Sequence, residues 1–363
     1  MKNIFPTLVC MASSLMANAG VIKIIDANDG QPVSGATIMS KTGHIIGISD
    51  GDGKFSNASS ADFPLSIGCI GYQAAEASDI DTKVSLSPAT YMLAEVEINP
   101  ASHPVTKMTC FAREYLSGTA GADTIQMYSE YMAVAYIADG KVKGYKKTDA
   151  KPSVRNSSRY ARVLKAGNDS VFCPKKTDDV SMMSMFDIMG NISGSQLKLT
   201  DTMLAGAKED SIPGKYGVKS LFRKRNNTLS VTIDALSDKK DRKWSPWFMK
   251  LLGITADFDK VTSSLLYSEN DNNVYDYRNL LSINYQVHMI GRGKLFKKAF
   301  GTGENLDFNC LVEVFPLSQE QLTPEEYDED RRDNDVIPFE YPERITPLPS
   351  AVERLIKLSS EAH

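Results

Sequence analysis

Residues 20–98 alternate between short apolar runs and turns built from Gly, Asp, Asn and Pro. The runs are rich in Val, Ile, Phe and Tyr, which favour strands. Short strands at intervals of about 8–12 residues are typical of a β-sandwich. We therefore predict a small β-sandwich over 20–98, with strands at Gly20–Asp26, Pro32–Met39, Ile45–Ser49, Lys54–Ser56, Pro64–Ile70, Val84–Leu86 and Met92–Ile98.

A Pro-broken linker at 99–104 separates this sandwich from residues 105–363, whose pattern is less regular. The period over 123–137 fits either a helix or a strand. Residues 147–212 are rich in Ser, Asn, Asp and Lys and contain a Met-rich stretch, so we expect loops there. Further strands are expected at Leu229–Ala235, Thr262–Tyr267, Leu280–Ile290 and Leu306–Phe315, and the last two, which are the longest, are expected to pair.

Three short stretches carry helix signals. Ser245 followed by Pro246 suits a helix start, and Thr323-Pro-Glu-Glu326 is a capping box. Pro349–Ser360 has an amphipathic pattern typical of a terminal helix. The fold class predicted for the chain is therefore mainly β, with a few helices and a C-terminal, mostly antiparallel domain that could form half of a barrel.

The first 19 residues have the pattern of a signal peptide. Lys2 precedes an apolar stretch at Ile4–Met16, and Ala17-Asn18-Ala19 is a small-x-small cleavage site. Cys10 offers an alternative as a lipid-attachment cysteine, although Val9 before it is larger than such signals favour. We expect export to the periplasm or association with the outer membrane.

Several motifs within the predicted sandwich resemble one known family. These are Asp29-Gly-Gln-Pro-Val-Ser-Gly-Ala36, Asp50-Gly-Asp-Gly-Lys-Phe55 and Gly68-Cys-Ile-Gly-Tyr72. Together they resemble the carboxypeptidase-regulatory-like domain, a transthyretin-like sandwich that often begins envelope proteins of Bacteroidota. The resemblance implies a prealbumin-type fold and an envelope location, and it says little about function. Farther on, the spacing of Cys110–Tyr115, Ser129–Tyr136 and Lys141–Lys146 is similar to segments that follow this domain in such proteins.

Composition removes several classes of protein from consideration. The chain has 363 residues and a formal net charge of −4, which gives no sign of a nucleic-acid partner. It has no apolar run of about 18–20 residues, as a membrane-spanning helix would need. After export, Cys69, Cys110, Cys173 and Cys310 could form two disulfides in any of three pairings or remain buried thiols.

A search for catalytic motifs finds none. The histidines are His44, His103, His288 and His363, and none begins an HExxH or HxxE pattern. Nucleophile elbows, phosphate loops and dinucleotide fingerprints are also missing from the sequence. We interpret His288 as a structural strand residue and Asp50–Gly53 as a hairpin turn, so we expect no enzyme, metal or cofactor.

Three groups of residues remain as candidate sites. An apolar face that either binds a ligand or forms core comprises Leu280, Ile283, Tyr285, Val287 and Met289, opposite Phe308, Cys310, Val312 and Val314. Loose O-glycosylation motifs place candidate acceptors at Thr124, Ser170, Thr202 and Ser211. A basic stretch suited to an anionic membrane surface or simply to solvent contains Lys215, Arg223, Lys224, Arg225, Lys239, Lys240, Arg242, Trp244 and Trp247.

These observations favour a non-catalytic envelope protein that binds a protein, glycan or peptide. A carrier of an apolar ligand and an unrecognised hydrolase are the alternatives. A peripheral membrane contact is compatible with the first two, and a nucleic-acid partner is not expected.

Overall fold

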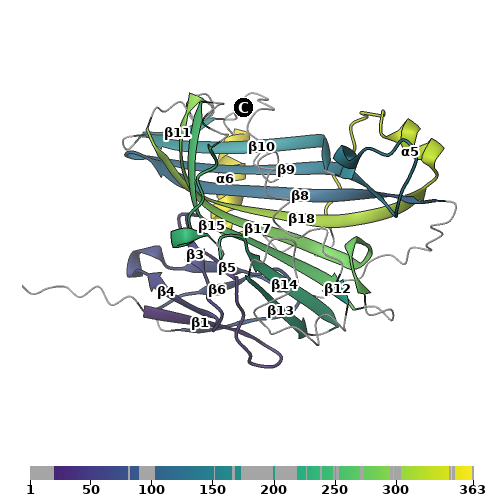
Figure 1. Ribbon diagram of the computed structural model, residues 1–363. Coiled ribbons are helices and arrows are strands. Elements are labelled where there is room, and N and C mark those ends of the chain that lie inside the picture. The colour runs from purple at the N-terminus through teal and green to yellow at the C-terminus, as the bar shows by residue number, and fades with distance from the viewer. Residues whose placement is uncertain are drawn as a thin grey trace, which may run out of the picture.

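The computed structural model of the chain is mainly β, which confirms the predicted fold class (Figure 1). The predicted signal segment at 1–19, the predicted strand at Met92–Ile98 and the Met-rich stretch lie outside the described residues. The structure describes residues 20–80, 82–89, 103–150, 152–165, 168–172, 199–200, 219–225, 227–237, 239–247, 250, 253–269, 274–294, 297, 304–342, 345 and 348–361.

Two small sheets pack face to face in the N-terminal part. One contains β4 (Lys54–Ala58), β1 (Gly20–Asp26) and β7 (Lys83–Leu86), in that order. The other has the order β3 (Ile45–Ile48), β2 (Thr37–Met39), β5 (Leu65–Gly68) and β6 (Ala75–Ala77). The core between the sheets includes Ile22, Ile24, Ile38, Leu65, Ile67 and Leu86, each fully buried.

Asp50–Gly53 forms a turn before β4, in agreement with its interpretation as a hairpin turn. The Asp50 Oδ1 atom accepts hydrogen bonds from the backbone N–H of Asp52 and of Lys54, at 2.9 and 2.8 Å. Gly53 has φ +70°, and a Cβ there would lie 2.3 Å from the Ile24 carbonyl oxygen. The Asp and Gly residues of this motif therefore serve the turn itself.

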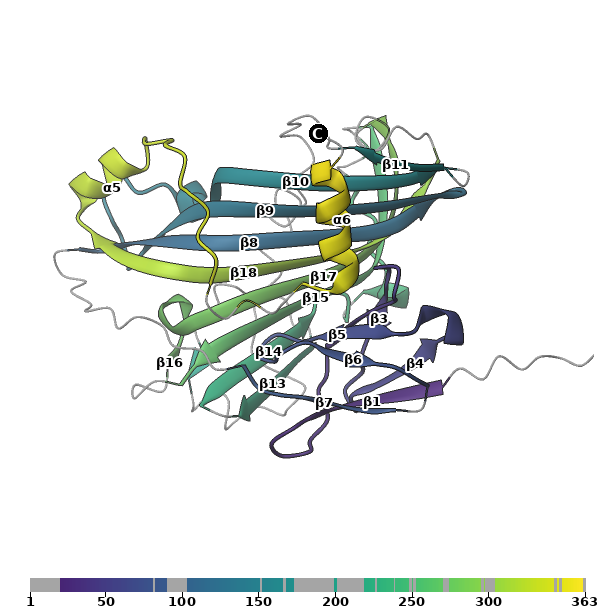
Figure 2. The ribbon, with the colours of Figure 1, turned by 180° about the vertical axis from the view of Figure 1, so that it is seen from behind.

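A nine-stranded antiparallel sheet forms the second, larger part and is strongly curved (Figures 1 and 2). Among the described strands the sheet is open, because its end strands β11 and β13 each pair with one of them. Its order is β11 (Asn168–Phe172), β10 (Ser153–Lys165), β9 (Asp123–Ala138), β8 (Val105–Ala120), β18 (Leu306–Leu322), β17 (Leu280–Gly293), β15 (Ile254–Ser268), β14 (Thr228–Asp234) and β13 (Lys219–Arg225).

The expectation of loops over 147–212 is wrong at β10 and β11. β10 pairs with β9 and β11 despite its many Ser and Arg residues, and most of its side chains are exposed or half-buried. Pairing with an apolar neighbour therefore outweighs the weak strand preference of its own residues. The same pairing resolves the ambiguous period over 123–137 as the strand β9.

Short elements connect and cover the strands. Thr323 caps α5 (Pro324–Asp330) as predicted: its Oγ1 accepts from the Glu326 N–H at 3.2 Å, and its own N–H donates to the Glu326 carboxylate at 2.8 Å. No helix among the described residues is both long and apolar enough to cross a bilayer. The remaining elements are α6 (Ser350–Glu361), the 3-10 turns η1 (Ser60–Asp62), η2 (Lys147–Ala150), η4 (Lys240–Arg242) and η5 (Tyr277–Asn279), and the paired strands β12 (Leu199–Thr200) and β16 (Val274–Tyr275).

The two faces of the large sheet are covered differently. Alternate side chains of its strands meet on the concave face in one apolar cluster. On the convex face lie the sandwich, α6 and the extended chain between α5 and α6 (Figure 2). This chain is fastened by the Tyr341 hydroxyl, which donates to the Glu130 carboxylate at 3.0 Å, and by the Tyr341 ring, 5.3 Å from that of Phe111.

Candidate ligand-binding site

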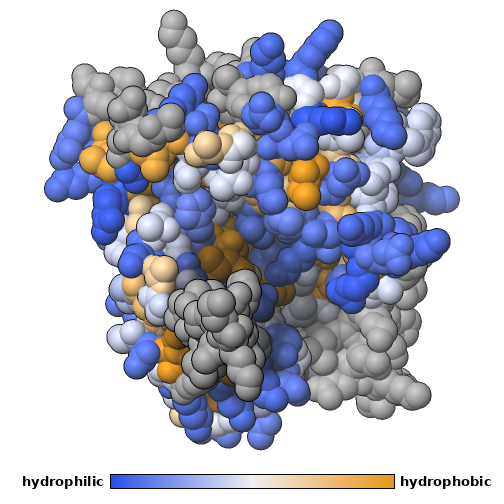
Figure 3. Space-filling model, turned by 90° about the vertical axis from the view of Figure 1, so that its left-hand side faces the viewer, coloured by the Kyte–Doolittle hydropathy of each residue, from blue (hydrophilic) through white to orange (hydrophobic). Residues whose placement is uncertain are grey.

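A cavity of about 260 Å³ lies between the sandwich and the convex face of the large sheet. The sandwich contributes β2, β5 and β6, the large sheet contributes β8, β9, β17 and β18, and the start of α6 closes one side. Seen from the side that carries β3 and β4, the molecule has a hollow with hydrophobic surface at its bottom (Figure 3). The larger lining side chains are Met39, Ile67, Arg113, Tyr115, Tyr128, Asn284, Leu311, Glu313, Leu348 and Val352.

The β2–β3 hairpin fixes the distance between the two walls. The Tyr115 hydroxyl donates to the Gly43 carbonyl at 2.5 Å, and the Gln126 amide donates to the Thr42 carbonyl at 2.6 Å. Farther along the sheet, the Gln286 amide donates to the Thr37 hydroxyl at 2.6 Å. Apolar contacts of Met39 and Ile45 with the large sheet add to these bonds. Direct contacts between the sandwich and the large sheet therefore hold the two walls of the cavity at a fixed separation.

Most of the exposed surface of the cavity is apolar, although nine of its nineteen lining residues carry polar side chains, and three of these, Glu76, Arg113 and Glu313, are charged. The Arg113 Nε atom donates to the Glu313 carboxylate at 2.5 Å, and their side chains are only 7% and 14% exposed. Asn284 is 5% exposed and lines the cavity from β17. Apolar walls with a few fixed polar groups are the usual composition of a small-molecule site.

The two lining tyrosines are held as neutral donors. Burial raises the pKa of Tyr115 above its ordinary value. Burial also raises the pKa of Tyr128, and the neighbouring Glu130 carboxylate adds to this effect. The Tyr128 hydroxyl donates to Glu130 at 2.8 Å. Both tyrosines are therefore protonated at neutral pH, and their hydroxyls donate hydrogen bonds within the protein.

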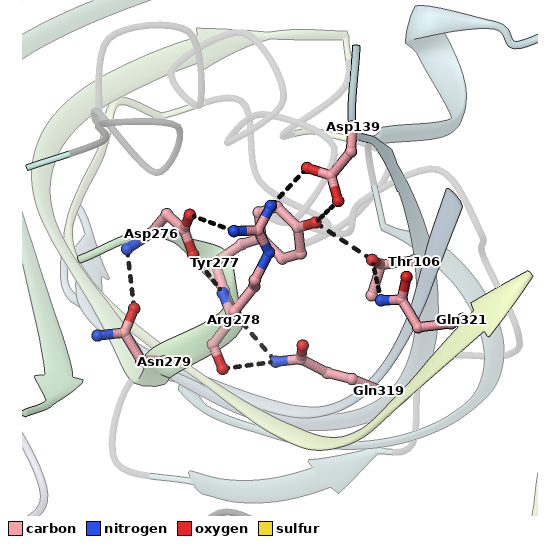
Figure 4. A network of polar contacts seen from close by, with 8 residues as sticks. All are labelled: Thr106, Asp139, Asp276, Tyr277, Arg278, Asn279, Gln319 and Gln321. Carbon is pink, nitrogen blue, oxygen red and sulfur yellow. Dashed lines mark hydrogen bonds and ion pairs between the residues drawn. The ribbon is translucent and has the colours of Figure 1, made fainter. Parts of the chain in front are cut away.

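A separate polar network crosses one end of the curved sheet (Figure 4). Asp139 accepts from the Arg278 guanidinium at 2.7 Å and from the Tyr277 hydroxyl at 2.9 Å. The Gln319 amide donates to the backbone carbonyls of Tyr277 and Arg278, both at 3.2 Å. The network thus joins η5 to β18 and to the end of β9. Because its side chains bind one another, it cross-links these segments of the curved sheet.

Comparisons with known proteins add little to this geometry. No family model matches the chain, and no curated protein matches it. Among solved structures, the chain is similar to an acetoacetate decarboxylase-like enzyme from Sphingomonas wittichii RW1, with 9% identity and a TM-score of 0.15. The similarity covers 63% of this chain and 98% of that chain, and a TM-score of this size carries no argument about function.

The predicted apolar face lies on the concave side of the sheet. Tyr285, Val287 and Met289 are in register with Val312, Cys310 and Phe308, as the predicted pairing of the two strands requires. Apart from Tyr285, which is partly buried against it, these residues belong to the concave core cluster together with Leu280 and Ile283.

The predicted basic stretch is only partly described. Lys239, Lys240 and Arg242 are exposed, Arg242 pairs with Asp234, and Trp247 is 73% exposed. Trp244 instead packs on Phe258, with ring centres 5.3 Å apart, and the Lys224 ammonium lies 5.3 Å from the centre of the Tyr275 ring. Lys215 and the side chains of Arg223 and Arg225 lie outside the described residues.

The candidate glycosylation sites are scattered. Thr124 is half-buried in β9, between its register partners Thr119 and Leu164, and such a position gives a glycan little room. Ser170 lies in β11, and Thr202 and Ser211 lie outside the described residues.

Among the cysteines, Cys69, Cys110 and Cys310 are free buried thiols, and Cys173 lies outside the described residues. Burial raises the pKa of Cys110 to about 12, so its thiol stays protonated at neutral pH. Of the two alternatives left open by the sequence, the structure shows buried thiols at these three positions.

His288 is flanked by two carboxylates on the convex face. Its Nδ1 atom lies 2.5 Å from Asp259 and its Nε2 atom 2.8 Å from Asp307. These carboxylates are 44% and 53% exposed, and His288 lines neither described cavity. No group of three or more His, Cys, Asp or Glu side chains in the described ranges is arranged to hold a metal ion.

Arg113, Glu313 and Asn284 did not appear among the candidates from the sequence. The available signal was charge inside mostly apolar segments: Arg113 and Glu114 in Phe111-Ala-Arg-Glu-Tyr115, and Glu313 in Leu311-Val-Glu-Val-Phe315. The register places Arg113 directly opposite Glu313, and no local pattern specifies this pairing.

Proposed function

We propose that the protein is a non-catalytic binding protein of the cell envelope, and that its ligand lies in the cavity between the sandwich and the large sheet. The observation that carries the proposal is the cavity itself, with its largely apolar surface, the internal ion pair of Arg113 and Glu313, and the buried residue Asn284. The signal pattern at residues 1–19 supports export.

The size of the cavity limits the ligand. An apolar cavity of about 150 Å³ accommodates benzene, so a cavity of about 260 Å³ suits roughly ten carbon atoms. The ligand, or the part of it that is enclosed, is thus a short aliphatic chain or a small ring system. The carrier alternative agrees with such a ligand. The face that the sequence offered for it, at Leu280–Met289, belongs to the packed concave core, so the ligand proposed here lies on the convex side of the sheet instead.

Filling the cavity provides the test. Gly68 lines it, and a Cβ added at Gly68 meets no atom within 4 Å. Gly68→Leu therefore occupies part of the cavity without a clash, and we expect it to weaken binding of decan-1-ol about tenfold. Isothermal titration calorimetry measures this affinity.

Gly51→Leu is the matched control, because a Cβ at Gly51 also meets no atom within 4 Å and Gly51 lies in an exposed turn away from the cavity. It should bind decan-1-ol like the unmodified protein. Equal binding by both variants, or no binding of decan-1-ol by the unmodified protein, would refute the proposed site.

A further inference from the structure

We infer that the ligand of this cavity carries an anionic head group, which the protein binds at the mouth of the cavity through Lys41 and Arg354. This inference rests on the proposed function. Its starting point is a second cavity of about 330 Å³, which adjoins the first because both are lined by Ser66, Glu76 and Ser350. Lys41 and Arg354 line only the second cavity.

The two cavities differ in charge. In the first, Arg113 pairs with Glu313, and Glu76 lies where the first cavity meets the second. At the mouth, neither Lys41 nor Arg354 makes an ion pair with any residue that the structure describes, and both are exposed. Glu76 offsets one of these positive charges and leaves an excess of one. A ligand with an apolar chain in the first cavity and a negatively charged group in the second therefore matches both cavities.

The start of α6 strengthens this arrangement. Ser350, the first residue of this 12-residue helix, lines both cavities. The N–H groups of Val352 and Glu353 donate to the Pro349 carbonyl at 2.8 and 3.1 Å. The helix dipole makes this end of α6 positive. Inside, Asn284, which is only 5% exposed, lines the first cavity and offers it an amide group. A ligand with both a polar group and an apolar chain can contact the start of α6 and the Asn284 amide, whereas an entirely apolar ligand cannot form hydrogen bonds with them.

The chemical class is consequently an amphiphile of roughly ten carbons with a carboxylate or a phosphate monoester as its head. Both head groups offer oxygen acceptors to an ammonium and a guanidinium. A guanidinium binds either one in a bidentate manner. A phosphate monoester carries more negative charge than a carboxylate at neutral pH. The affinity of a phosphate ligand should therefore depend more strongly on Lys41 and Arg354 than the affinity of a carboxylate ligand does.

Three ligands of equal chain length test the inference by calorimetry on the full mature chain: decanoate, decyl phosphate and decan-1-ol. We expect Lys41→Gln and Arg354→Gln each to weaken decanoate binding about threefold. Decyl phosphate should be affected more strongly, and decan-1-ol should not change. Glu76→Gln should act in the opposite direction and strengthen decanoate binding by a similar factor. These differences should fade between about 0.02 and 0.5 M salt, because exposed charges are screened.

Lys357→Gln is the matched control, since Lys357 lies on the same helix, is 76% exposed and pairs with Glu361 away from the cavities. It should leave all three affinities unchanged. If decan-1-ol binds as tightly as both anions and the mouth variants have no effect, the inference of an anionic head group is wrong while the cavity remains a binding site. If Gly68→Leu also has no effect, the proposed function fails as well.

Discussion

Arg113 and Glu313 show how one pair of residues can shape a binding site. Arg113 lies beside Glu114 in β8, and Glu313 lies between Val312 and Val314 in β18. The side chains of Arg113 and Glu313 meet where the sandwich covers the large sheet. The Arg113 guanidinium also lies 6.0 Å from the centre of the Phe315 ring. A buried charge that loses its partner is costly, whereas an apolar pair of similar volume is tolerated.

We therefore expect Glu313→Gln to lower the free energy of unfolding by about 3 kcal/mol, because Arg113 keeps its charge in a buried site. The double variant Arg113→Met with Glu313→Leu should recover most of this loss. Urea denaturation followed by circular dichroism measures both. Lys357→Gln removes an exposed pair and should cost less than about 0.5 kcal/mol; a loss as large as that of Glu313→Gln would contradict this reasoning.

The β2–β3 hairpin is the element that joins the two parts of the molecule. Its turn accepts hydrogen bonds from Tyr115 and Gln126, and the N–H of Ile45 donates to the Ser117 hydroxyl at 2.9 Å. His44 lies within this turn and is half-buried. Burial lowers the pKa of His44 below its ordinary value of 6.5, and the attraction of Asp62 opposes this only in part.

This lowered pKa predicts the direction of a pH effect. The unfolded chain takes up a proton at His44 more readily than the folded chain does, so stability from this site is present above pH 6.5 and decreases as the pH falls below it. Thermal unfolding between pH 7.5 and 5.5 should show a decrease in melting temperature that is smaller in His44→Gln. An equal decrease in both proteins would mean that His44 does not contribute.

At the scale of the whole molecule, the sandwich and the large sheet share an apolar cluster. Met39 and Ile45 from the sandwich pack with Tyr115, Tyr128 and Leu311 from the sheet. We therefore expect the two parts to unfold together rather than in separate steps.

Both tryptophans of the chain, Trp244 and Trp247, belong to the large-sheet part, so their fluorescence reports its unfolding. Met39→Ala in the sandwich should shift this signal to lower urea concentration, corresponding to a loss of about 2 kcal/mol. Val21→Ala, at a position 41% exposed in the same sandwich, should not shift it. A Trp transition unchanged by Met39→Ala would show that the two parts unfold independently.

The sequence alone determined the mainly β class, most strand positions, the α5 capping box and the pairing of β17 with β18. These features depend on residues close in sequence: alternation places every second side chain on one face, and a capping box closes over three residues. The sequence could not resolve β9, and it misled at β10, where the decisive interactions come from neighbouring strands.

Only the tertiary structure decided which face of the large sheet the sandwich covers, and hence where the candidate site lies. Arg113 and Glu313 are 200 residues apart, and Gln286 reaches the backbone of Gly35 across 251 residues. Alternation gives each strand two faces, but it does not say what covers each face. The cavity exists because several chain segments far apart in sequence meet without filling the space between them, and no local pattern encodes such a gap.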